Sequence, residues 1–174
     1  MKIESINKPL YRRKANIVIV GFVVLFALSS LAFGSLLISL FGNQAVVEQE
    51  STGNFHWNLI GVLLGLLTSV SLLNQVKGHP FFKEVVYVWQ MKQLHNRIFR
   101  RLKQIKSAAE QEDLQAYTIL KFYYQSQKQI FELDNNTLTL DSVMRELEKI
   151  EDWERKQGVR LKTGEIDETW LNQF

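Results

Sequence analysis

The side chains that could do acid–base or metal chemistry in this sequence are three histidines and a few acidic pairs. His56, His79 and His95 have no second metal ligand three or four residues away, the spacing that places two ligands on one helix face. Acidic neighbours such as Glu151 and Asp152 fall on a helix face that the pattern predicts to be solvated. Because the sequence has no cysteine, thiolate metal sites and disulfides are excluded. These residues predict no catalytic, cofactor-binding or metal-ligating site.

Motifs of common enzymes and transporters are also absent from the sequence. It contains no phosphate-binding glycine loop, no GxSxG nucleophile elbow and no HExxH zinc motif. Its two long apolar runs hold no ionisable residue, whereas ion pathways and proton relays in membranes normally require one. We therefore expect neither an enzyme nor a transporter, and no cofactor or small-molecule substrate.

Small residues four positions apart form the pattern with the clearest structural meaning. Gly61 and Gly65 make a GxxxG pair in the second apolar run, and Ser30 and Gly34 have the same spacing in the first. Such pairs lie on one helix face and let two helix backbones approach closely in a membrane. The spacing predicts helix packing at these four residues, with chance spacing as the alternative interpretation.

The small residues belong to two runs that are long and apolar enough to cross a bilayer. Residues 17–41 and 57–76 contain no charged group, and a helix of about 20 apolar residues spans the bilayer core. Two such runs in 174 residues leave too little protein to bury them. A cleaved signal peptide is the alternative for the first run, but no small-x-small cleavage site follows it. We expect a transmembrane hairpin over 17–76, with a connecting loop at 42–56.

Charges beside the two spans predict the orientation of the hairpin. The segment 1–16 is strongly basic, the loop 42–56 has no Lys or Arg, and Lys77 and Lys83 follow the second span closely. Lys and Arg near the ends of spans remain on the cytoplasmic side. Both termini are therefore expected in the cytoplasm and the loop outside.

Residues 77–174 have the pattern of a cytoplasmic helical domain, with helices at about 80–109, 114–133 and 140–157. Asn135 and Asn136 predict a turn, since Asn tolerates left-handed backbone conformation, and 165–174 could add a short helix. In the first helix a narrow apolar stripe is typical of a coiled-coil seam: Tyr87, Met91, Leu94, Ile98, Leu102 and Ile105. The predicted fold class is an all-α membrane protein, a two-helix transmembrane hairpin followed by a cytoplasmic bundle of about three helices, with 1–16 as a separate basic segment.

A second apolar face begins in the segment VKGHPFF (76–82), where the chain leaves the second span and Pro80 suits a new helix. The face ends at Lys92 and comprises Phe81, Phe82, Val85, Val88 and Trp89. We expect it to lie against the membrane surface or a partner, with Lys77, Lys83 and Lys92 contacting anionic lipid phosphates. Packing on the protein's own second cytoplasmic helix is the alternative.

Charge is divided unevenly along the cytoplasmic part. Residues 77–106 have eight basic groups and one acidic group, whereas 107–174 have eight basic and fourteen acidic groups. The basic helix can be neutralised by the acidic helices and by anionic lipid, and an external acidic partner is the alternative. Nucleic-acid binding is disfavoured, because the positive charge lies next to the membrane and no aromatic stacking pattern interleaves with it.

Two stretches, GNFHWNLIGVLLGLL and HPFFKEVVYVWQMKQLHNRIFRRLKQIK, resemble a family of small two-span inner-membrane proteins of Gram-negative bacteria, classed as a domain of unknown function. The resemblance covers nearly the whole chain and is most specific at 79–80, 87–89 and 97–102. It implies a multi-pass protein of the bacterial inner membrane, and it carries no activity, substrate or cofactor.

These observations together predict a non-catalytic integral membrane protein that serves as a membrane-anchored interaction or assembly module. It would bind another protein or a second copy of itself through the long cytoplasmic helix and its aromatic end. A lipid-responsive regulatory module on the anionic cytoplasmic leaflet is the alternative, and a membrane-tethered nucleic-acid binder is less favoured.

Overall fold

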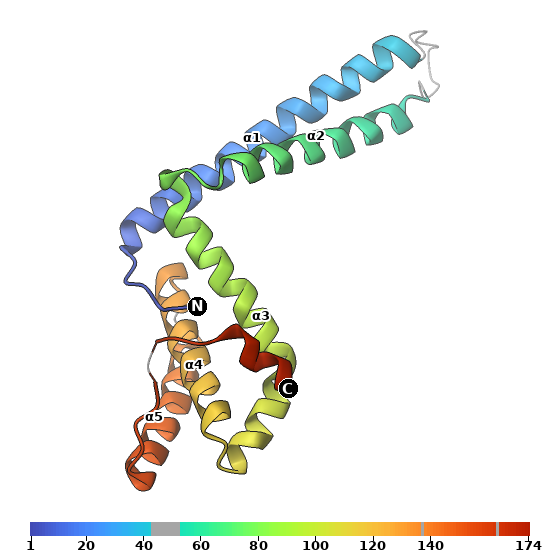
Figure 1. The fold of residues 1–174 in the computed structure, drawn as a ribbon. Coiled ribbons are helices and arrows are strands. Elements are labelled where there is room, and N and C mark those ends of the chain that lie inside the picture. Colours follow the sequence, from blue (N-terminus) through green and yellow to red (C-terminus); the bar gives the residue numbers. More distant parts are fainter. Residues whose placement is uncertain (43–52, 137, 163) are drawn as a thin grey trace. The chain divides into compact units, whose positions relative to one another are not determined.

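The computed structural model describes residues 1–42, 53–136, 138–162 and 164–174. Within these ranges the regular elements are helices. No strand occurs in them, and the β-type pairing there is an isolated antiparallel bridge between Lys2 and Glu165. The elements in chain order are α1 (Lys8–Phe41), α2 (Phe55–Val76), the 3-10 turn η1 (Pro80–Phe82), α3 (Lys83–Glu110), α4 (Leu114–Asp134), α5 (Leu140–Gln157) and the 3-10 turn η2 (Glu168–Gln173) (Figure 1). The predicted all-helical class is confirmed.

The chain divides into two compact units. One, the hairpin unit, is residues 13–83, and the other, the bundle unit, combines residues 1–12 with residues 84–174. Residues 1–12, which belong to the predicted basic segment 1–16, are grouped by their contacts with the helices α3 to α5. Most of the predicted loop 42–56 lies outside the described residues.

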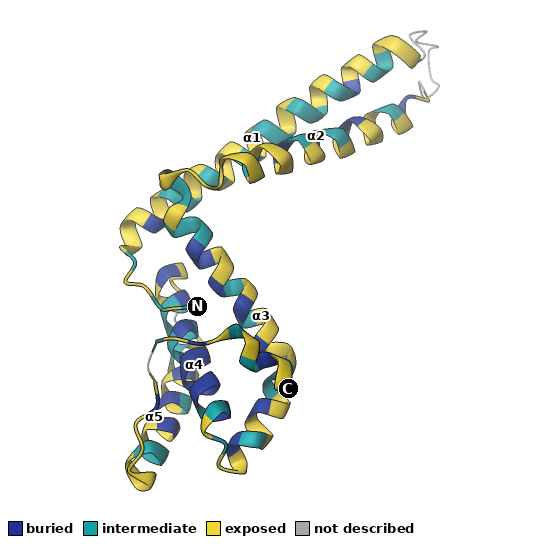
Figure 2. Cartoon of the chain, in the orientation of Figure 1, coloured by how far each residue is buried: buried dark blue, intermediate teal, exposed yellow. Residues whose placement is uncertain are grey.

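Within the hairpin unit, α1 and α2 lie side by side (Figure 1). The helix α1 begins at Lys8, well before the predicted span, because Asn7 caps it: the Leu10 N–H donates to Asn7 Oδ1 (3.0 Å). At the other end of the hairpin the rings of Phe41 and Trp57 stack with centroids 5.3 Å apart. Most of the apolar surface of both helices is exposed (Figure 2).

The core of the bundle unit is formed by α3, α4, α5 and the C-terminal tail. From the predicted seam of α3, Tyr87, Met91, Leu94, Ile98 and Ile105 are buried, and Leu102 is half-buried. They share the core with Phe122 of α4 and with apolar residues of α5 and the tail: Val143, Leu147, Ile150, Leu161, Ile166 and Leu171. The seam is thus one wall of an intramolecular core.

Local signals place the helix ends close to the predicted positions. Asp113 caps α4, since its Oδ1 accepts from the N–H groups of Gln115 (2.7 Å) and Ala116 (3.1 Å). Asn135 ends α4 in the left-handed region at φ 58°, and Gly158 ends α5 at φ 64°. The short C-terminal element is a 3-10 turn, η2, capped by Asp167.

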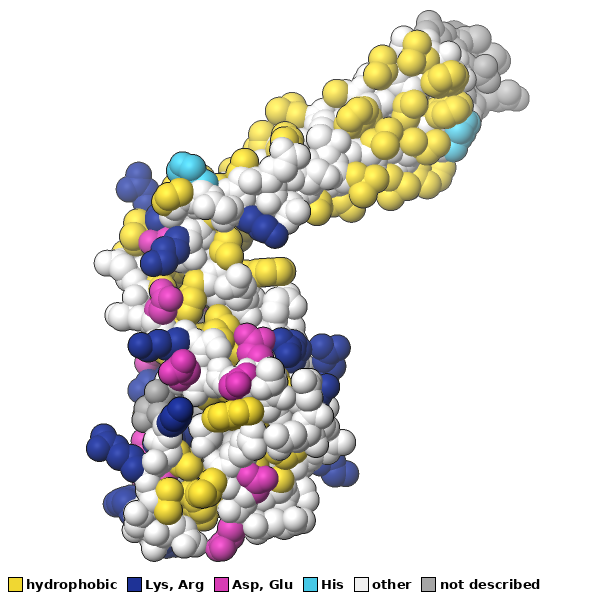
Figure 3. Space-filling model, in the orientation of Figure 1, with side chains coloured by type: hydrophobic (Ala, Val, Ile, Leu, Met, Phe, Trp, Pro, Cys, Tyr) yellow, Lys and Arg dark blue, Asp and Glu magenta, His cyan; other side chains and the backbone are white. Residues whose placement is uncertain are grey.

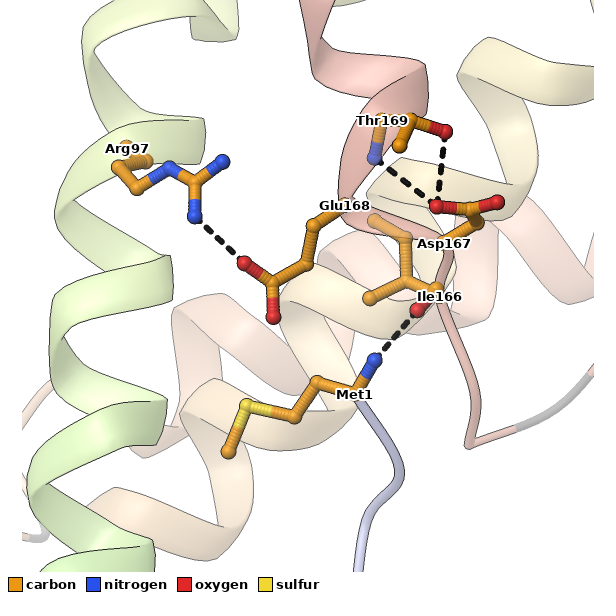
Figure 4. A network of polar contacts seen from close by, with 6 residues as sticks. All are labelled: Met1, Arg97, Ile166, Asp167, Glu168 and Thr169. Atoms are coloured by element: carbon orange, nitrogen blue, oxygen red, sulfur yellow. Dashed lines mark hydrogen bonds and ion pairs between the residues drawn. The ribbon is translucent and has the colours of Figure 1, made fainter.

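The N-terminal residues are tied to the C-terminal tail by backbone hydrogen bonds. The Ile3 N–H donates to the Gly164 carbonyl (2.7 Å), and the Ile166 N–H donates to the Met1 carbonyl (2.9 Å). The Met1 amine in turn donates to the Ile166 carbonyl (2.6 Å), as Figure 4 shows. These bonds are the physical reason why residues 1–12 join the bundle unit.

Candidate membrane and partner interfaces

The predicted small residues of the two spans lie directly against one another in the hairpin unit. A Cβ added to Gly61 would stand 2.6 Å from the Gly34 Cα, and one added to Gly65 would stand 2.8 Å from the Ser30 Cα. Real Cβ atoms do not approach backbone so closely, so any larger residue would force α1 and α2 apart. The structure therefore brings together all four residues of the GxxxG-type prediction.

Two serines extend this close contact toward the end of α2 at Val76. Ser69, which is fully buried, donates to the Gly65 carbonyl (2.8 Å), and its Oγ lies 3.5 Å from the Oγ of Ser29. Ser29 Oγ also lies within hydrogen-bond distance of the Gly65 carbonyl (3.3 Å) across the helix pair. Ser69 follows Gly65 by four residues, so the same spacing rule could have included it.

The exit segment forms a capped turn after α2. His79 caps η1, because the Phe81 N–H donates to its Nδ1 (3.2 Å), and Pro80 follows at the first position of the turn. The rings of Phe81 and Phe82 meet edge to face at 5.2 Å. Both rings line an apolar cavity of about 290 Å³ with residues 17–25 of α1 and 69–76 of α2. His79 therefore has a structural role at the turn.

The predicted apolar face beyond this turn is not continuous. Phe81, Phe82 and Val85 are half-buried, Trp89 is 57% exposed, and Val88 is 2% exposed. The placement of Val88 on an outward face is thus corrected: it lies in the core next to Tyr87 and Met91. The buried stripe of α3 is broader at this end than a coiled-coil seam, and it takes in the residue that follows Tyr87.

The three lysines predicted to contact lipid phosphates also have different surroundings. Lys92 Nζ lies 2.6 Å from Asp134 Oδ2 at the end of α4, an ionic contact inside the bundle unit, and its side chain is 43% exposed. Its contact with lipid stays a prediction. A lysine midway along α3 can reach α4 because the two helices pack in one bundle. Lys77 and Lys83 belong to the hairpin unit and are exposed.

The outer face of α3 carries two exposed aromatic side chains among basic groups. Trp89 and Phe99 are 57% and 65% exposed, and Arg100 and Lys103 are exposed beside them on the same helix. Arg97 is instead paired with Glu168 of η2, as Figure 4 shows. This face is defined as Trp89, Phe99, Arg100 and Lys103, and its Trp, Phe and Arg are residue types that are enriched in protein interfaces.

A buried ion pair inside the bundle unit was not anticipated from the sequence. Lys121 Nζ lies 2.8 and 2.7 Å from the two carboxylate oxygens of Glu154, with side-chain exposures of 8% and 11%. Glu154 also accepts from the Leu161 N–H (2.7 Å). The pair thus ties α4, α5 and the tail together. Its signal in the sequence is that Lys121 lies four residues after Tyr117, within the apolar arc of α4.

His95 makes a second buried polar contact between α3 and α4. Its Nε2 lies 2.6 Å from the Ser126 Oγ, and its ring stacks on Tyr123 with centroids 4.6 Å apart. Burial lowers the pKa of His95 to about 4, so the imidazole is neutral at pH 7. Ser126 is fully buried and already lies 2.7 Å from the Phe122 carbonyl, to which its hydroxyl donates. This arrangement links α3 to α4.

No group of three or more His, Asp or Glu residues that could hold a metal ion occurs in the described ranges. Two helices there, α1 and α2, are long and apolar enough to cross a membrane. Comparisons with curated proteins and with solved structures gave no match. The family model DUF3087, described as a protein of unknown function, matches residues 1–171. The chain therefore belongs to the DUF3087 family.

Proposed function

We propose that this protein is a non-catalytic, membrane-anchored interaction module. The hairpin unit would insert in the bacterial inner membrane with both termini in the cytoplasm. The bundle unit would bind a protein partner through the outer face of α3. The observation that carries the proposal is the exposure of Trp89 and Phe99 on a helix whose other face forms the core.

Membrane insertion is supported by the surface of the hairpin unit. The most apolar stretches of α1 and α2 have mean hydropathies of 2.6 and 1.9, yet only 6% and 17% of them are buried. A core helix of a soluble protein with this composition would be mostly buried. Figure 3 shows hydrophobic side chains over the hairpin surface that faces the viewer. Exposing this area to water would cost roughly 25 cal/mol for each Å², and lipid removes that cost.

The orientation rests on the basic residues that flank the spans. Arg12, Arg13 and Lys14 precede the apolar part of α1, and Lys77 and Lys83 follow α2. Positive groups at these positions favour the cytoplasmic side. A phosphatase fusion within 45–52 should be active and one after Phe174 inactive, because that enzyme folds only outside the cytoplasm. The reverse activities would show that the orientation is wrong.

The partner surface is expected to be apolar with acidic groups at its rim. Trp89 and Phe99 would enter apolar pockets, and Arg100 and Lys103 would pair with the carboxylates around them. Aromatic and Arg side chains contribute most of the binding energy in many interfaces. A second copy of this chain would be recognised in the test by an adduct of twice the chain's mass.

In-cell photocrosslinking of the full chain tests this proposal. A photoreactive amino acid at 89 or 99 should give one discrete adduct, and the same group at the exposed α5 position 151 should not. Arg100→Glu with Lys103→Glu should reduce the adduct about tenfold, as expected for losing two charged contacts, whereas Lys156→Glu on α5 should leave it unchanged. Equal labelling at all three positions, or none, would contradict the proposal.

A second candidate function is binding of the anionic leaflet, and one observation favours it. The described residues of the hairpin unit include Arg13, Lys14, Lys77 and Lys83 and no acidic residue. Each Lys or Arg near an anionic membrane surface contributes about 1 kcal/mol. The thermal midpoint of the reconstituted chain should rise with the fraction of phosphatidylglycerol. Lys77→Gln with Lys83→Gln should remove that rise if the leaflet is the ligand.

A further inference from the structure

The apolar cavity that Phe81 and Phe82 line with α1 and α2 is suited to a hydrocarbon chain. Its lining, from α1, α2 and the Phe81–Phe82 pair, is apolar except for Ser69. The Ser69 hydroxyl donates to the Gly65 carbonyl, so it has no proton left for a polar ligand. The volume of about 290 Å³ is about twice that of an apolar cavity of roughly 150 Å³ known to bind benzene. This chemistry selects a slender apolar occupant.

Gly21 has a different role from the glycines of the helix contact. A Cβ at Gly61 or Gly65 would collide with α1, whereas a Cβ at Gly21 would meet no heavy atom within 4 Å. Gly21 lines the cavity, so its missing side chain leaves room there. The lining residues Ile17, Leu72 and Val76 are 50%, 40% and 45% exposed, which shows that the cavity opens to the outside of the unit.

A positive charge lies next to the Phe81 ring of the cavity lining. The Lys14 ammonium lies 5.6 Å from the centroid of the Phe81 ring, which is itself part of the lining. Lys77 and Lys83 flank the Phe81–Phe82 pair in sequence. An apolar cavity with a lysine ammonium beside its lining matches the arrangement of an anionic phospholipid, in which a hydrocarbon chain is joined to a phosphate.

We propose that this cavity binds one acyl chain of an anionic phospholipid of the surrounding bilayer, with Lys14 beside the headgroup phosphate. The acyl chain lies between α1 and α2 at Gly21, and the end that is joined to the headgroup lies at Phe81. Charge complementarity favours an anionic lipid over a zwitterionic one. The inference rests on the membrane insertion proposed above and adds a specific lipid site to it.

The test uses the full chain reconstituted in phosphatidylcholine vesicles that contain phosphatidylglycerol with a photoreactive diazirine in one acyl chain. Mass spectrometry then locates the adducts. They should concentrate on the lining residues Phe22 and Leu25 over the exposed residues Val24 and Leu28 of the same helix. Phosphatidylcholine carrying the same diazirine should label Phe22 and Leu25 less.

Gly21→Leu fills the cavity, and Ala27→Leu adds the same kind of side chain at an exposed position outside it. Gly21→Leu should lower labelling of Phe22 and Leu25 about tenfold, the change expected from losing about two buried methylene groups. Ala27→Leu should leave it unchanged. Lys14→Gln should abolish the preference for phosphatidylglycerol while labelling by phosphatidylcholine persists.

Several results would overturn the lipid site. They are equal labelling of lining and outer residues, unchanged labelling in Gly21→Leu, and equal labelling by the two lipids. Because Gly21→Leu could disturb the helix pair, its thermal midpoint is compared with that of Ala27→Leu, and Lys14→Gln tests the headgroup independently. Vesicle flotation separates the two levels of failure: a chain that does not float refutes insertion and the site with it, whereas a floating chain without selective labelling refutes the site alone.

Discussion

The backbones of Gly61 and Gly34 touch in the hairpin unit, so closely that a Cβ on Gly61 would stand 2.6 Å from the Gly34 Cα. The contact joins helices whose remaining apolar surface is mostly exposed. In lipid, helix association depends on such close packing, since apolar side chains gain little by leaving the hydrocarbon. The Gly61–Gly34 contact should therefore contribute much of the stability of the hairpin.

We expect Gly61→Leu to destabilise the hairpin unit by about 1–3 kcal/mol, because overpacking at a backbone contact separates the helices. The measurement is the thermal midpoint of the full chain in mild detergent. Ala27→Leu is the matched control, since Ala27 is an exposed residue of α1. If both variants melt together with the wild type, the glycine contact does not stabilise the protein.

The buried Lys121–Glu154 pair gives a prediction for the bundle unit. Lys121→Met should destabilise the unit by about 3–5 kcal/mol, because it leaves the Glu154 carboxylate buried without a counter-charge. Adding Glu154→Gln should recover most of the loss, since the amide oxygen still accepts from the Leu161 N–H and carries no charge. Denaturant unfolding of the wild type and the two variants in detergent, followed by circular dichroism, measures these changes. A double variant no more stable than Lys121→Met would refute this account of the pair.

Acidification should destabilise the bundle unit through His95. Its pKa in the folded protein is about 4, below the ordinary value of 6.5, so between these pH values the unfolded chain binds the extra proton. The stabilisation is therefore complete above pH 6.5 and is lost as the pH falls toward 4, by at most about 3 kcal/mol. The difference between wild type and His95→Gln in thermal midpoint, followed from pH 7 to 4, isolates this contribution from that of the carboxylates. A constant difference would contradict the predicted titration.

Helix positions could be predicted from the sequence because their signals are local. Apolar periodicity marks α4 and α5, and Asn135 marks the turn after α4. Both helices begin at the predicted residues, 114 and 140. Four-residue spacing likewise pointed to Gly61 and Gly65. The Ile3–Gly164 hydrogen bond could not be predicted, since it joins residues at opposite ends of the chain with no local pattern.

The candidate surfaces of α3 were predicted only in part, for a related reason. Periodicity identifies which residues share a helix face, but the width of the buried stripe depends on the neighbours that pack against it. Val88 is buried and Lys92 reaches Asp134 because α4 and the tail cover more of α3 than a narrow seam requires. Phe99 was missed as a surface residue because it lies alone among basic groups, outside any apolar stripe.

The exposed Trp89 distinguishes a protein partner from the bilayer as the ligand of α3. Replacing Trp57, Trp153 and Trp170 with Phe leaves Trp89 as the single tryptophan, and Phe preserves the aromatic contacts with Phe41 and Tyr117. Because Trp89 is 57% exposed, the purified chain in phosphatidylcholine vesicles should show the red emission of a solvated indole and quenching by aqueous acrylamide.

Brominated lipids complete the Trp89 measurement, because bromine quenches only an indole that touches the acyl region. If α3 binds a protein partner, brominated phosphatidylcholine should leave Trp89 emission unchanged, and emission should shift to the blue when the partner is added. Quenching by the brominated lipid would place Trp89 in the bilayer and favour the leaflet-binding alternative. A blue emission without lipid quenching in the purified monomeric chain would put the indole in the core and refute the partner surface, since a buried Trp89 cannot enter a pocket on another protein.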